Sequence, residues 1–315
     1  MLNILFLVIG FILLIKGADL FVDSSSALAT RLRIPPIIIG LTVVAFGTSA
    51  PEAAVSISAS ISGSNDIAIG NIIGSNLFNL LMVSGISALL LPIAISRDTI
   101  RRDFPMSLVS AVLLLVLSLV GMADMQLTRI DGIILLLFFC WFMYTSIHSA
   151  RAFQKSEAPV DLTTIDIMPL PKSIIIGIIG IVGIVLGGHT VVIASTSIAR
   201  IFGISERLIG LTIVAIGTSL PELVTSVVAA KKGQADIAMG NVLGSNMFNI
   251  FFILGISAFI SPLTIALESV IDTSILIAVS AIAYFIAWKN KKISRLSGGF
   301  LVAIYIIYAI YIIMR

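Results

Sequence analysis

Charged residues are scarce in this chain and make up only 11% of its 315 residues. A water-soluble domain carries about 25% charged residues and roughly 45–50% apolar residues. Here 58% of the residues are hydrophobic, and the mean hydropathy is +1.16. The composition therefore disfavours a water-soluble enzyme or a nucleic-acid-binding domain, and it predicts a protein whose surroundings are a lipid bilayer.

Cysteine and histidine are also rare. The single cysteine, Cys140, excludes an internal disulfide and a cysteine-based metal cluster. Because Cys140 lies within an apolar run, we expect it to be a small buried hydrophobic side chain. The chain has only two histidines, so a metal site built from sulfur or imidazole ligands is disfavoured as well.

Long apolar runs are abundant. A membrane-spanning helix needs about 20 mostly apolar residues, and the chain holds ten candidate runs. The expected spans are residues 2–22, 36–61, 67–91, 105–122, 130–147, 173–198, 208–230, 237–261, 273–288 and 298–314. The longest polar break, 149–171, separates two five-helix halves, 1–148 and 172–315, and is too short for a folded regulatory domain.

Basic residues orient the predicted spans. With the N-terminus outside, the inner loops hold fourteen Lys and Arg, and the outer side holds four. Loops rich in positive charge stay in the cytoplasm. We therefore expect a multi-pass protein of the cell membrane with both termini outside and the linker 149–171 in the cytoplasm. Lys16 and Asp19, near the inner end of the first span, are expected to form an interfacial ion pair.

The two halves share a repeat. Residues 40–79 and 210–249 align without a gap at an offset of 170, and 23 of the 40 positions are identical. Many of the matches are polar residues that are costly in lipid, so their repetition indicates a shared task. Each half has five spans, an odd number, so the second half enters the membrane from the opposite side and the repeats are inverted. The loop charges agree, because 62–66 has no basic residue whereas its counterpart contains Lys231 and Lys232. Inverted repeats with ion sites near the membrane midplane are typical of secondary transporters.

Glu52 and Glu222 are the acidic residues deepest within the apolar runs, at equivalent positions of the repeat. An unpaired carboxylate at that depth is costly, so the pair indicates a shared ligand. Helical spacing places Thr48 and Ser49 on the face of Glu52, and Thr218 and Ser219 on the face of Glu222. Ser75 and Ser245 reach a similar depth on the third and eighth spans, and Asn79 and Asn249 share their helix faces. Pro51 and Pro221 are expected to break their helices and free backbone carbonyls. Close helix packing is the expected role of four glycines, Gly70, Gly74, Gly240 and Gly244.

The predicted ligand atoms are hard oxygens, which suit Ca²⁺, Na⁺ or Mg²⁺ rather than Zn²⁺ or Cu⁺. Two glutamates neutralise one Ca²⁺, and this permits a divalent ion in a site of low dielectric. Several Na⁺ could bind the same oxygens, so the two kinds of occupancy would exclude each other. Antiport follows if the protein changes access only when its carboxylates are neutralised.

The motifs GTSAPE at 47–52 and GTSLPE at 217–222 each precede a GNxxGSNxFN run, at 70–79 and 240–249. In this the chain resembles the sodium/calcium exchanger branch of the calcium/cation antiporters. The resemblance implies a helical core made of the second, third, seventh and eighth spans, four adjoining cation sites, and first and sixth spans that slide across the core. It also implies the cation ligands Glu52, Glu222, Thr48, Thr218, Ser49, Ser219, Ser75, Ser245, Asn79, Asn249 and the backbone carbonyls of Ala45 and Ala215.

Together these features predict an all-α polytopic membrane protein of ten helices in two inverted five-helix repeats, which exchanges Na⁺ for Ca²⁺ by alternating access. Asn at both 79 and 249 disfavours potassium co-transport, which the resemblance associates with an acid at the second position. Antiport of Ca²⁺ or another divalent cation against protons or another cation stays open and, more weakly, so does a cation channel. We expect no enzymatic activity, no cofactor, no nucleic acid and no obligatory protein partner, with the chain functional as a monomer.

Overall fold

The computed structural model describes residues 2–120, 125–156, 168–203 and 215–315. The first half contains α1 (Leu2–Leu32), α2 (Pro36–Ile39), η1 (Gly40–Val44), α3 (Ala45–Thr48), α4 (Ala50–Ile61), α5 (Asn65–Phe78), η2 (Asn79–Val83), α6 (Ser84–Leu90), β1 (Ile93–Ala94), η3 (Thr99–Asp103), α7 (Phe104–Val120), β2 (Gln126–Leu127) and α8 (Arg129–Ser156). The second half contains α9 (Leu170–Ile201), α11 (Ala215–Thr218), α12 (Leu220–Lys231), α13 (Ala235–Met247), η5 (Phe248–Leu254), α14 (Gly255–Ile260), β3 (Leu263–Thr264), α15 (Leu267–Asn290), β4 (Lys292–Ile293) and α16 (Arg295–Met314). The η elements are π-helical turns.

Eight of the described helical stretches are long and apolar enough to cross a membrane. A further pair, Pro36–Thr48 and Ala50–Ile61, passes the same test as one span that is bent by 52°. The expected span at 208–230 begins outside the described ranges, and its later part forms α11 and α12. The described chain is thus a helical, multi-pass membrane protein with eight or nine candidate spans, and the full number of ten stays a prediction.

α1 extends to Leu32, ten residues beyond the predicted end of the first span at residue 22. The acidic residues Asp19 and Asp23 lie inside this helix, and a cation from another element meets them. Lys232, in the connection between α12 and α13, has its Nζ 2.6 Å from Asp19 Oδ1 and 2.7 Å from Asp23 Oδ1. The expected ion pair between Lys16 and Asp19 is therefore wrong, since within the described residues the cation at Asp19 is Lys232.

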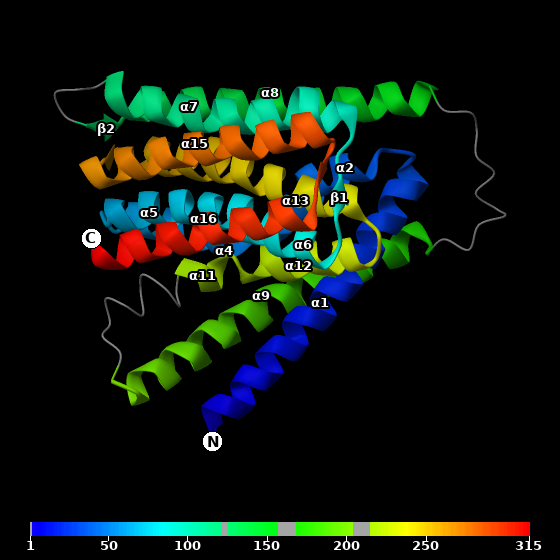
Figure 1. Cartoon of the computed structure of the whole chain (residues 1–315), viewed down its shortest axis with the longest axis horizontal. Coiled ribbons are helices and arrows are strands. Elements are labelled where there is room, and N and C mark those ends of the chain that lie inside the picture. The colour runs from blue at the N-terminus through cyan, green and yellow to red at the C-terminus, as the bar shows by residue number, and fades with distance from the viewer. Residues whose placement is uncertain (1, 121–124, 157–167, 204–214) are drawn as a thin grey trace.

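α1 and α9 form a pair that crosses the other helices diagonally (Figure 1). Their backbones touch at glycines. A Cβ on Gly17 would lie 2.7 Å from the backbone nitrogen of Ile184, and a Cβ on Gly187 would lie 2.5 Å from that of Leu14. Small residues of this kind let membrane helices approach closely. Glycines therefore let the two backbones touch, while the large side chains of Leu14, Phe21 and Ile184 are buried in the same hydrophobic cluster.

The two halves of the chain interlock. β1 pairs with β4, where Ile93 lies opposite Ile293, and β2 pairs with β3, where Leu127 lies opposite Leu263. In the same way α6 packs against α16, and α14 packs against α8. The last helix of each half, α8 or α16, therefore covers a helix of the third span of the other half, α14 or α6. Residues of both halves share one hydrophobic core.

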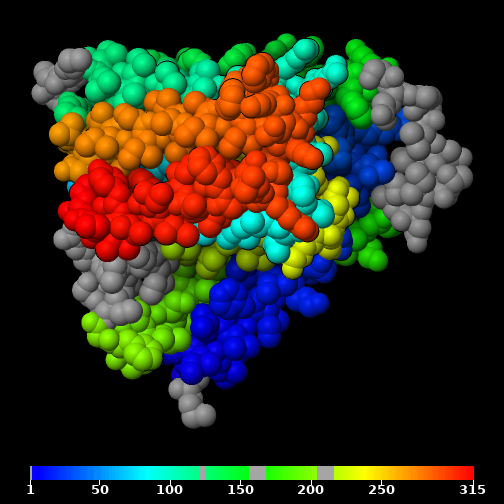
Figure 2. All heavy atoms as spheres, in the orientation of Figure 1, coloured from blue at the N-terminus to red at the C-terminus, as the bar shows by residue number. Residues whose placement is uncertain are grey.

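Large apolar side chains cover much of the outside of the molecule. Figure 2 shows α15 and α16 across one face, and Phe300 and Ile307 of α16 are among their exposed side chains. Cys140 of α8 is also exposed, which contradicts the expectation that it is buried. An apolar run in a membrane protein does not imply burial within the protein, because the hydrocarbon of the bilayer accepts an apolar side chain equally well.

Candidate cation-binding site

A break interrupts the helix ahead of each glutamate. Ser49 separates α3 from α4 with φ −82° and ψ 10°, and Ser219 separates α11 from α12 with φ −92° and ψ 5°. Pro51 and Pro221 explain both breaks, because proline lacks an N–H and clashes with the carbonyl four residues earlier. The predicted breaks are confirmed, and each places a serine at the bend one turn ahead of a glutamate.

Glu52 and Glu222 are completely buried, with 0% of each residue exposed. Each accepts a hydrogen bond from the opposite half of the chain. Ser49 Oγ donates to Glu222 Oε1 at 2.9 Å, and Ser219 Oγ donates to Glu52 Oε1 at 3.1 Å. Ser75 Oγ lies 3.1 Å from the same oxygen of Glu52 and 2.7 Å from Ser219 Oγ. The fold therefore brings the predicted glutamates and three of the four predicted serines into one buried cluster.

Several buried polar atoms of the predicted ligands have no hydrogen-bond partner within the described chain. They are Glu52 Oε2, Glu222 Oε2, Ser245 Oγ, Asn249 Oδ1 and both amide atoms of Asn79. A buried carboxylate oxygen without a partner is costly, and carboxylate, hydroxyl and amide oxygens are the ligands of hard cations. Among the described residues no three His, Cys, Asp or Glu side chains gather to hold a metal. Among the described residues, the candidate ligand atoms are accordingly those of two carboxylates and of neutral hydroxyl and amide groups.

Two asparagines outside the predicted ligand set, Asn71 and Asn241, brace this cluster. Asn71 Nδ2 donates to Ser56 Oγ at 2.9 Å and to the backbone oxygen of Glu52 at 3.5 Å, while Asn71 Oδ1 accepts from Thr218 Oγ1 at 3.3 Å. Asn241 makes the same contacts with the halves exchanged, to Ser226 Oγ at 2.9 Å, to the backbone oxygen of Glu222 at 3.4 Å and from Thr48 Oγ1 at 3.0 Å. A signal for both was present, because each lies one helical turn before a selected serine and is identical in the repeat.

A second amide network joins the third and eighth spans. Asn76 and Asn246 each donate from Nδ2 to the backbone oxygen of the other at 3.3 Å. Asn249 Nδ2 donates to Asn76 Oδ1 at 3.0 Å. Asn79 and Asn249, which were predicted to line the centre, are both completely buried beside this network. These amides cross-link α5 to α13 and η5 next to the carboxylates.

The backbone near the breaks is irregular. The carbonyl oxygen of Ala45 accepts from Ser49 N at 3.0 Å and lies 3.4 Å from Thr48 Oγ1. Ala215 is the first residue of α11, directly after residues outside the described ranges. The π-helical turn η1 precedes Ala45, η2 begins at Asn79, and η5 contains Asn249. π-Helical turns are frequent at functional sites, and here three of them adjoin predicted ligands.

The repeat glycines pack as predicted in the second half. A Cβ on Gly244 would lie 2.5 Å from the carbonyl oxygen of Leu41, and Gly240 makes a similarly close approach. For Gly70 and Gly74, no described residue lies within 4 Å of such a Cβ. The segment equivalent in the repeat to the partner of Gly244 lies outside the described residues, so the packing role of the first pair stays a prediction.

A family model described as "Sodium/calcium exchanger protein" matches residues 2–148 and 172–314. The chain is 38% identical over 316 residues to the inner membrane protein YrbG of Escherichia coli, and the match covers 96% of this chain and 95% of that protein. It is 33% identical over 341 residues to the sodium/calcium exchanger MaX1 of Methanosarcina acetivorans, with 98% and 97% covered.

Solved structures agree. The sodium-calcium exchanger NCX_Mj, soaked with Na⁺ and Sr²⁺, superimposes with a TM-score of 0.85 at 32% sequence identity, and the match covers 98% of this chain and 97% of that one. Family and structural relatives are exchangers, not enzymes. The chain belongs to the sodium/calcium exchanger family and is a membrane antiporter of the calcium/cation antiporter superfamily.

Proposed function

We propose that this antiporter exchanges Na⁺ for Ca²⁺ by alternating access at the buried cluster. The observation that carries the proposal is the pair of fully buried glutamates, each with one carboxylate oxygen that has no partner within the described chain. Two carboxylates match the charge of one Ca²⁺, and hydroxyl and amide oxygens supply the neutral ligands that hard cations accept. Na⁺ would compete for the same oxygens, because all of them are hard ligands.

Twelve residues would provide the ligands. Glu52 and Glu222 would bind both kinds of ion. The neutral ligands would be the side chains of Thr48, Thr218, Ser49, Ser219, Ser75, Ser245, Asn79 and Asn249 and the carbonyls of Ala45 and Ala215. One chain would suffice and no protein partner would be needed, because both halves of the cluster come from the same chain.

The proposed arrangement is two inverted five-helix repeats, 1–148 and 172–315, in the cell membrane with both termini outside and the linker 149–171 cytoplasmic. Contacts that recur with the halves exchanged support the inversion. The bond from Ser49 to Glu222 has its counterpart in the bond from Ser219 to Glu52, and the pairing of β1 with β4 has its counterpart in that of β2 with β3. α1 and α9 would move across the core together, because their glycines hold the two helices in close contact with each other.

Flux measurements test the site. We expect that Glu52→Gln and Glu222→Gln each abolish ⁴⁵Ca²⁺ uptake driven by an outward Na⁺ gradient in proteoliposomes, because each removes one of the two charges that balance Ca²⁺. Glu268→Gln is the matched control, since Glu268 is exposed in the first turn of α15, and it should transport normally. Uptake near the wild-type rate in both site variants would disprove the assignment.

The coupling ion needs its own measurement. Gradients of Na⁺, K⁺ and H⁺ are imposed one at a time on vesicles that hold the wild-type protein. We expect only the Na⁺ gradient to drive Ca²⁺ uptake, and K⁺ to be dispensable, because both central positions carry neutral amides. Uptake driven equally well by a pH gradient would favour proton coupling, and Ca²⁺ conductance without any counter-ion would indicate a channel.

A further inference from the structure

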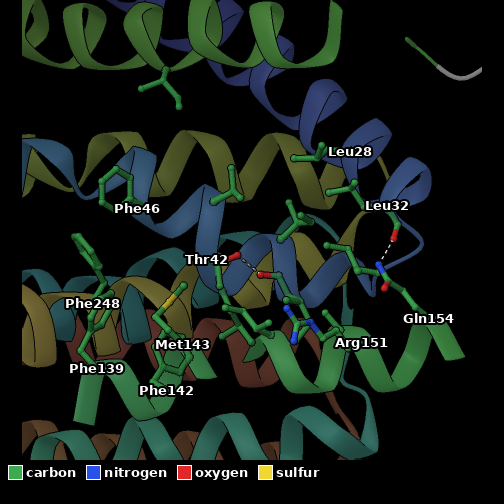
Figure 3. Close-up of a pocket in the computed structure, with 18 residues that line it drawn as sticks. Leu28, Leu32, Thr42, Phe46, Phe139, Phe142, Met143, Arg151, Gln154 and Phe248 are labelled. Atoms are coloured by element: carbon green, nitrogen blue, oxygen red, sulfur yellow. Dashed lines mark hydrogen bonds between the residues drawn. The ribbon is translucent and has the colours of Figure 1, made fainter. Parts of the chain in front are cut away.

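An apolar groove lies between α8 and the first broken span, and none of the proposed cation ligands lines it. Its volume is about 620 Å³, and α8 faces α2, η1 and α3 across it, with α1, α9 and η5 at its margins. Figure 3 shows Phe46 and Phe248 toward one end and Leu32, Arg151 and Gln154 toward the other. We call this the α2–α8 groove. Its size falls in the range of small-molecule sites, roughly 300–1,000 Å³.

The walls of the α2–α8 groove suit hydrocarbon. Phe46 is 58% exposed and Ile147 is 46% exposed where they line it, so the groove opens toward the bilayer. Thr42 is a polar side chain within the wall, and its hydroxyl donates to the backbone oxygen of Ile38 at 2.6 Å. Away from the end formed by Arg151 and Gln154, walls of this kind offer water few hydrogen-bond partners. The occupant therefore has an apolar chain.

One end of the groove is positively charged. Arg151 is exposed, and no ion pair or hydrogen bond within the described residues involves its side chain. Lys155, one turn further along α8, is also exposed. Gln154 Nε2 donates to the backbone oxygen of Leu32 at 2.6 Å, which fixes this end of α8 against the end of α1. No Asp or Glu is among the lining residues. A free guanidinium is suited to a two-pronged contact with phosphate.

We propose that the α2–α8 groove binds an anionic phospholipid of the surrounding bilayer, with an acyl chain between α8 and the first broken span and its phosphate at Arg151. The combination of an apolar channel with an unpaired cation at one end carries the proposal. The wall formed by η1 and α3 leads directly to Thr48 and Ser49, so a bound lipid would touch the same backbone that positions the cation cluster. Lipid binding does not depend on which ions the protein exchanges.

Native mass spectrometry of the purified full-length protein tests the charged end. The protein in detergent is titrated with dioleoyl phosphatidylglycerol and, separately, with dioleoyl phosphatidylcholine. We expect one phosphatidylglycerol to be retained in preference to phosphatidylcholine. Arg151→Ala should reduce its retention about five-fold, as expected for one basic residue near an anionic lipid. Arg97→Ala, which removes an exposed arginine outside the groove, should leave retention unchanged.

A second variant tests the apolar part. Ile147→Trp should fill the groove and lower the retention of lipid, whereas Leu137→Trp, at a 63% exposed position of the same helix outside the groove, should not. All four variants should match the wild type in thermal unfolding. Equal retention of the two lipids by the wild type, or wild-type retention in Arg151→Ala or Ile147→Trp, would overturn the proposal. So would a wild type that retains no lipid, as expected if the chain's own linker covered the groove.

Discussion

At the scale of single residues, the cation cluster leaves one oxygen of each buried glutamate without a hydrogen-bond donor from the described chain. Glu52 and Glu222 each accept serine hydroxyls through Oε1 and leave Oε2 without a partner in the described chain. Asn71 and Asn241 use their amide protons on a serine hydroxyl and on the glutamate's own backbone oxygen, and their Oδ1 atoms hold the threonine of the other half. The amides thus fix the orientation of groups that would bind the ion.

Asn71→Ala should weaken the apparent Ca²⁺ affinity of the exchanger by about ten-fold or more, because loss of a residue that orients a ligand typically costs roughly 10–100-fold in metal affinity. The variant keeps both carboxylates, so its maximal exchange rate should fall less than its affinity. The measurement is the Ca²⁺ dependence of Na⁺-driven uptake. Asn290→Ala, at the exposed end of α15, is the control, and an unchanged Ca²⁺ dependence in Asn71→Ala would contradict the bracing role.

At the scale of elements, the sequence predicted the broken helices correctly because a proline acts locally. Pro51→Ala restores an N–H that can bond to the carbonyl of Gly47, so the bend at Ser49 should relax toward a continuous helix. We expect slower Na⁺/Ca²⁺ exchange together with an unfolding temperature that is unchanged or higher. Pro92→Ala, exposed in the connection after α6, should alter neither. Normal exchange in Pro51→Ala would show that the bend does not position the ligands.

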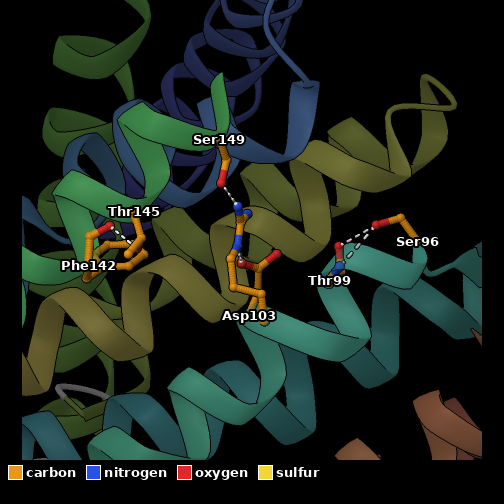
Figure 4. Close-up of polar contacts among 7 residues, drawn as sticks. Ser96, Thr99, Asp103, Phe142, Thr145 and Ser149 are labelled. Atoms are coloured by element: carbon orange, nitrogen blue, oxygen red, sulfur yellow. Dashed lines mark hydrogen bonds and ion pairs between the residues drawn. The ribbon is translucent and has the colours of Figure 1, made fainter. Parts of the chain in front are cut away.

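Arg102 of η3, the turn that precedes α7, makes a polar contact with α8. Arg102 Nε lies 2.7 Å from Asp103 Oδ1, and Arg102 also donates to Ser149 of α8 (Figure 4). Asp103 is only 2% exposed. Arg102→Ala should therefore lower the free energy of unfolding by about 1–3 kcal/mol, the cost of a buried polar group left without its partner. Thermal unfolding measures this, with the exposed neighbour Arg101→Ala as control. Asp103→Asn in the Arg102→Ala background should recover stability, and no recovery would assign the loss to packing.

At the scale of the whole molecule, Lys232 ties the loop between α12 and α13 to α1 through Asp19 and Asp23. Lys232→Met should destabilise this conformation by at most about 1 kcal/mol, because partly exposed ion pairs contribute little. That is enough to raise the population of another arrangement of α1 by about five-fold. Spin labels at Ile12 and Ile61, both exposed, in a Cys140→Ser background would report a second distance. Lys231→Met is the control, and a distance distribution identical to the wild type would contradict the link.

The contact of Lys232 with Asp19 and Asp23 should persist throughout the neutral pH range. Burial alone lowers the pKa of Lys232, but the hydrogen bonds and charges of Asp19 and Asp23 outweigh it, so the pKa is raised above its ordinary value. A raised pKa means that the contact contributes fully below the ordinary lysine pKa and is lost only as pH rises through the folded value. The spin-label distances should therefore not change between pH 6 and 9, and a shift within that interval would contradict the assignment.

Two predictions were wrong, the end of the first helix at residue 22 and the burial of Cys140, because each depends on groups outside its own segment. α1 was ended at residue 22 because polar residues follow, yet Lys232 from the other half compensates Asp19 and Asp23. Cys140 was expected to be buried because apolar neighbours surround it, yet the face of α8 that carries it is exposed. In the first case the partner is a cation distant in the sequence, and in the second it is the surrounding lipid. Neither can be inferred from the residues next to Asp19, Asp23 or Cys140.

The sequence by itself determined that the chain crosses a membrane, that two helices break near Pro51 and Pro221, and that two glutamates occupy equivalent positions, because hydropathy, proline and a repeat act within one segment. Only the tertiary structure decided that Ser49 meets Glu222 and Ser219 meets Glu52, and that Asn71 and Asn241 brace the opposite half. Helical spacing gives the face on which a side chain lies. Which other helix that face meets depends on packing across the whole chain, and buried donors and acceptors must then find their partners there.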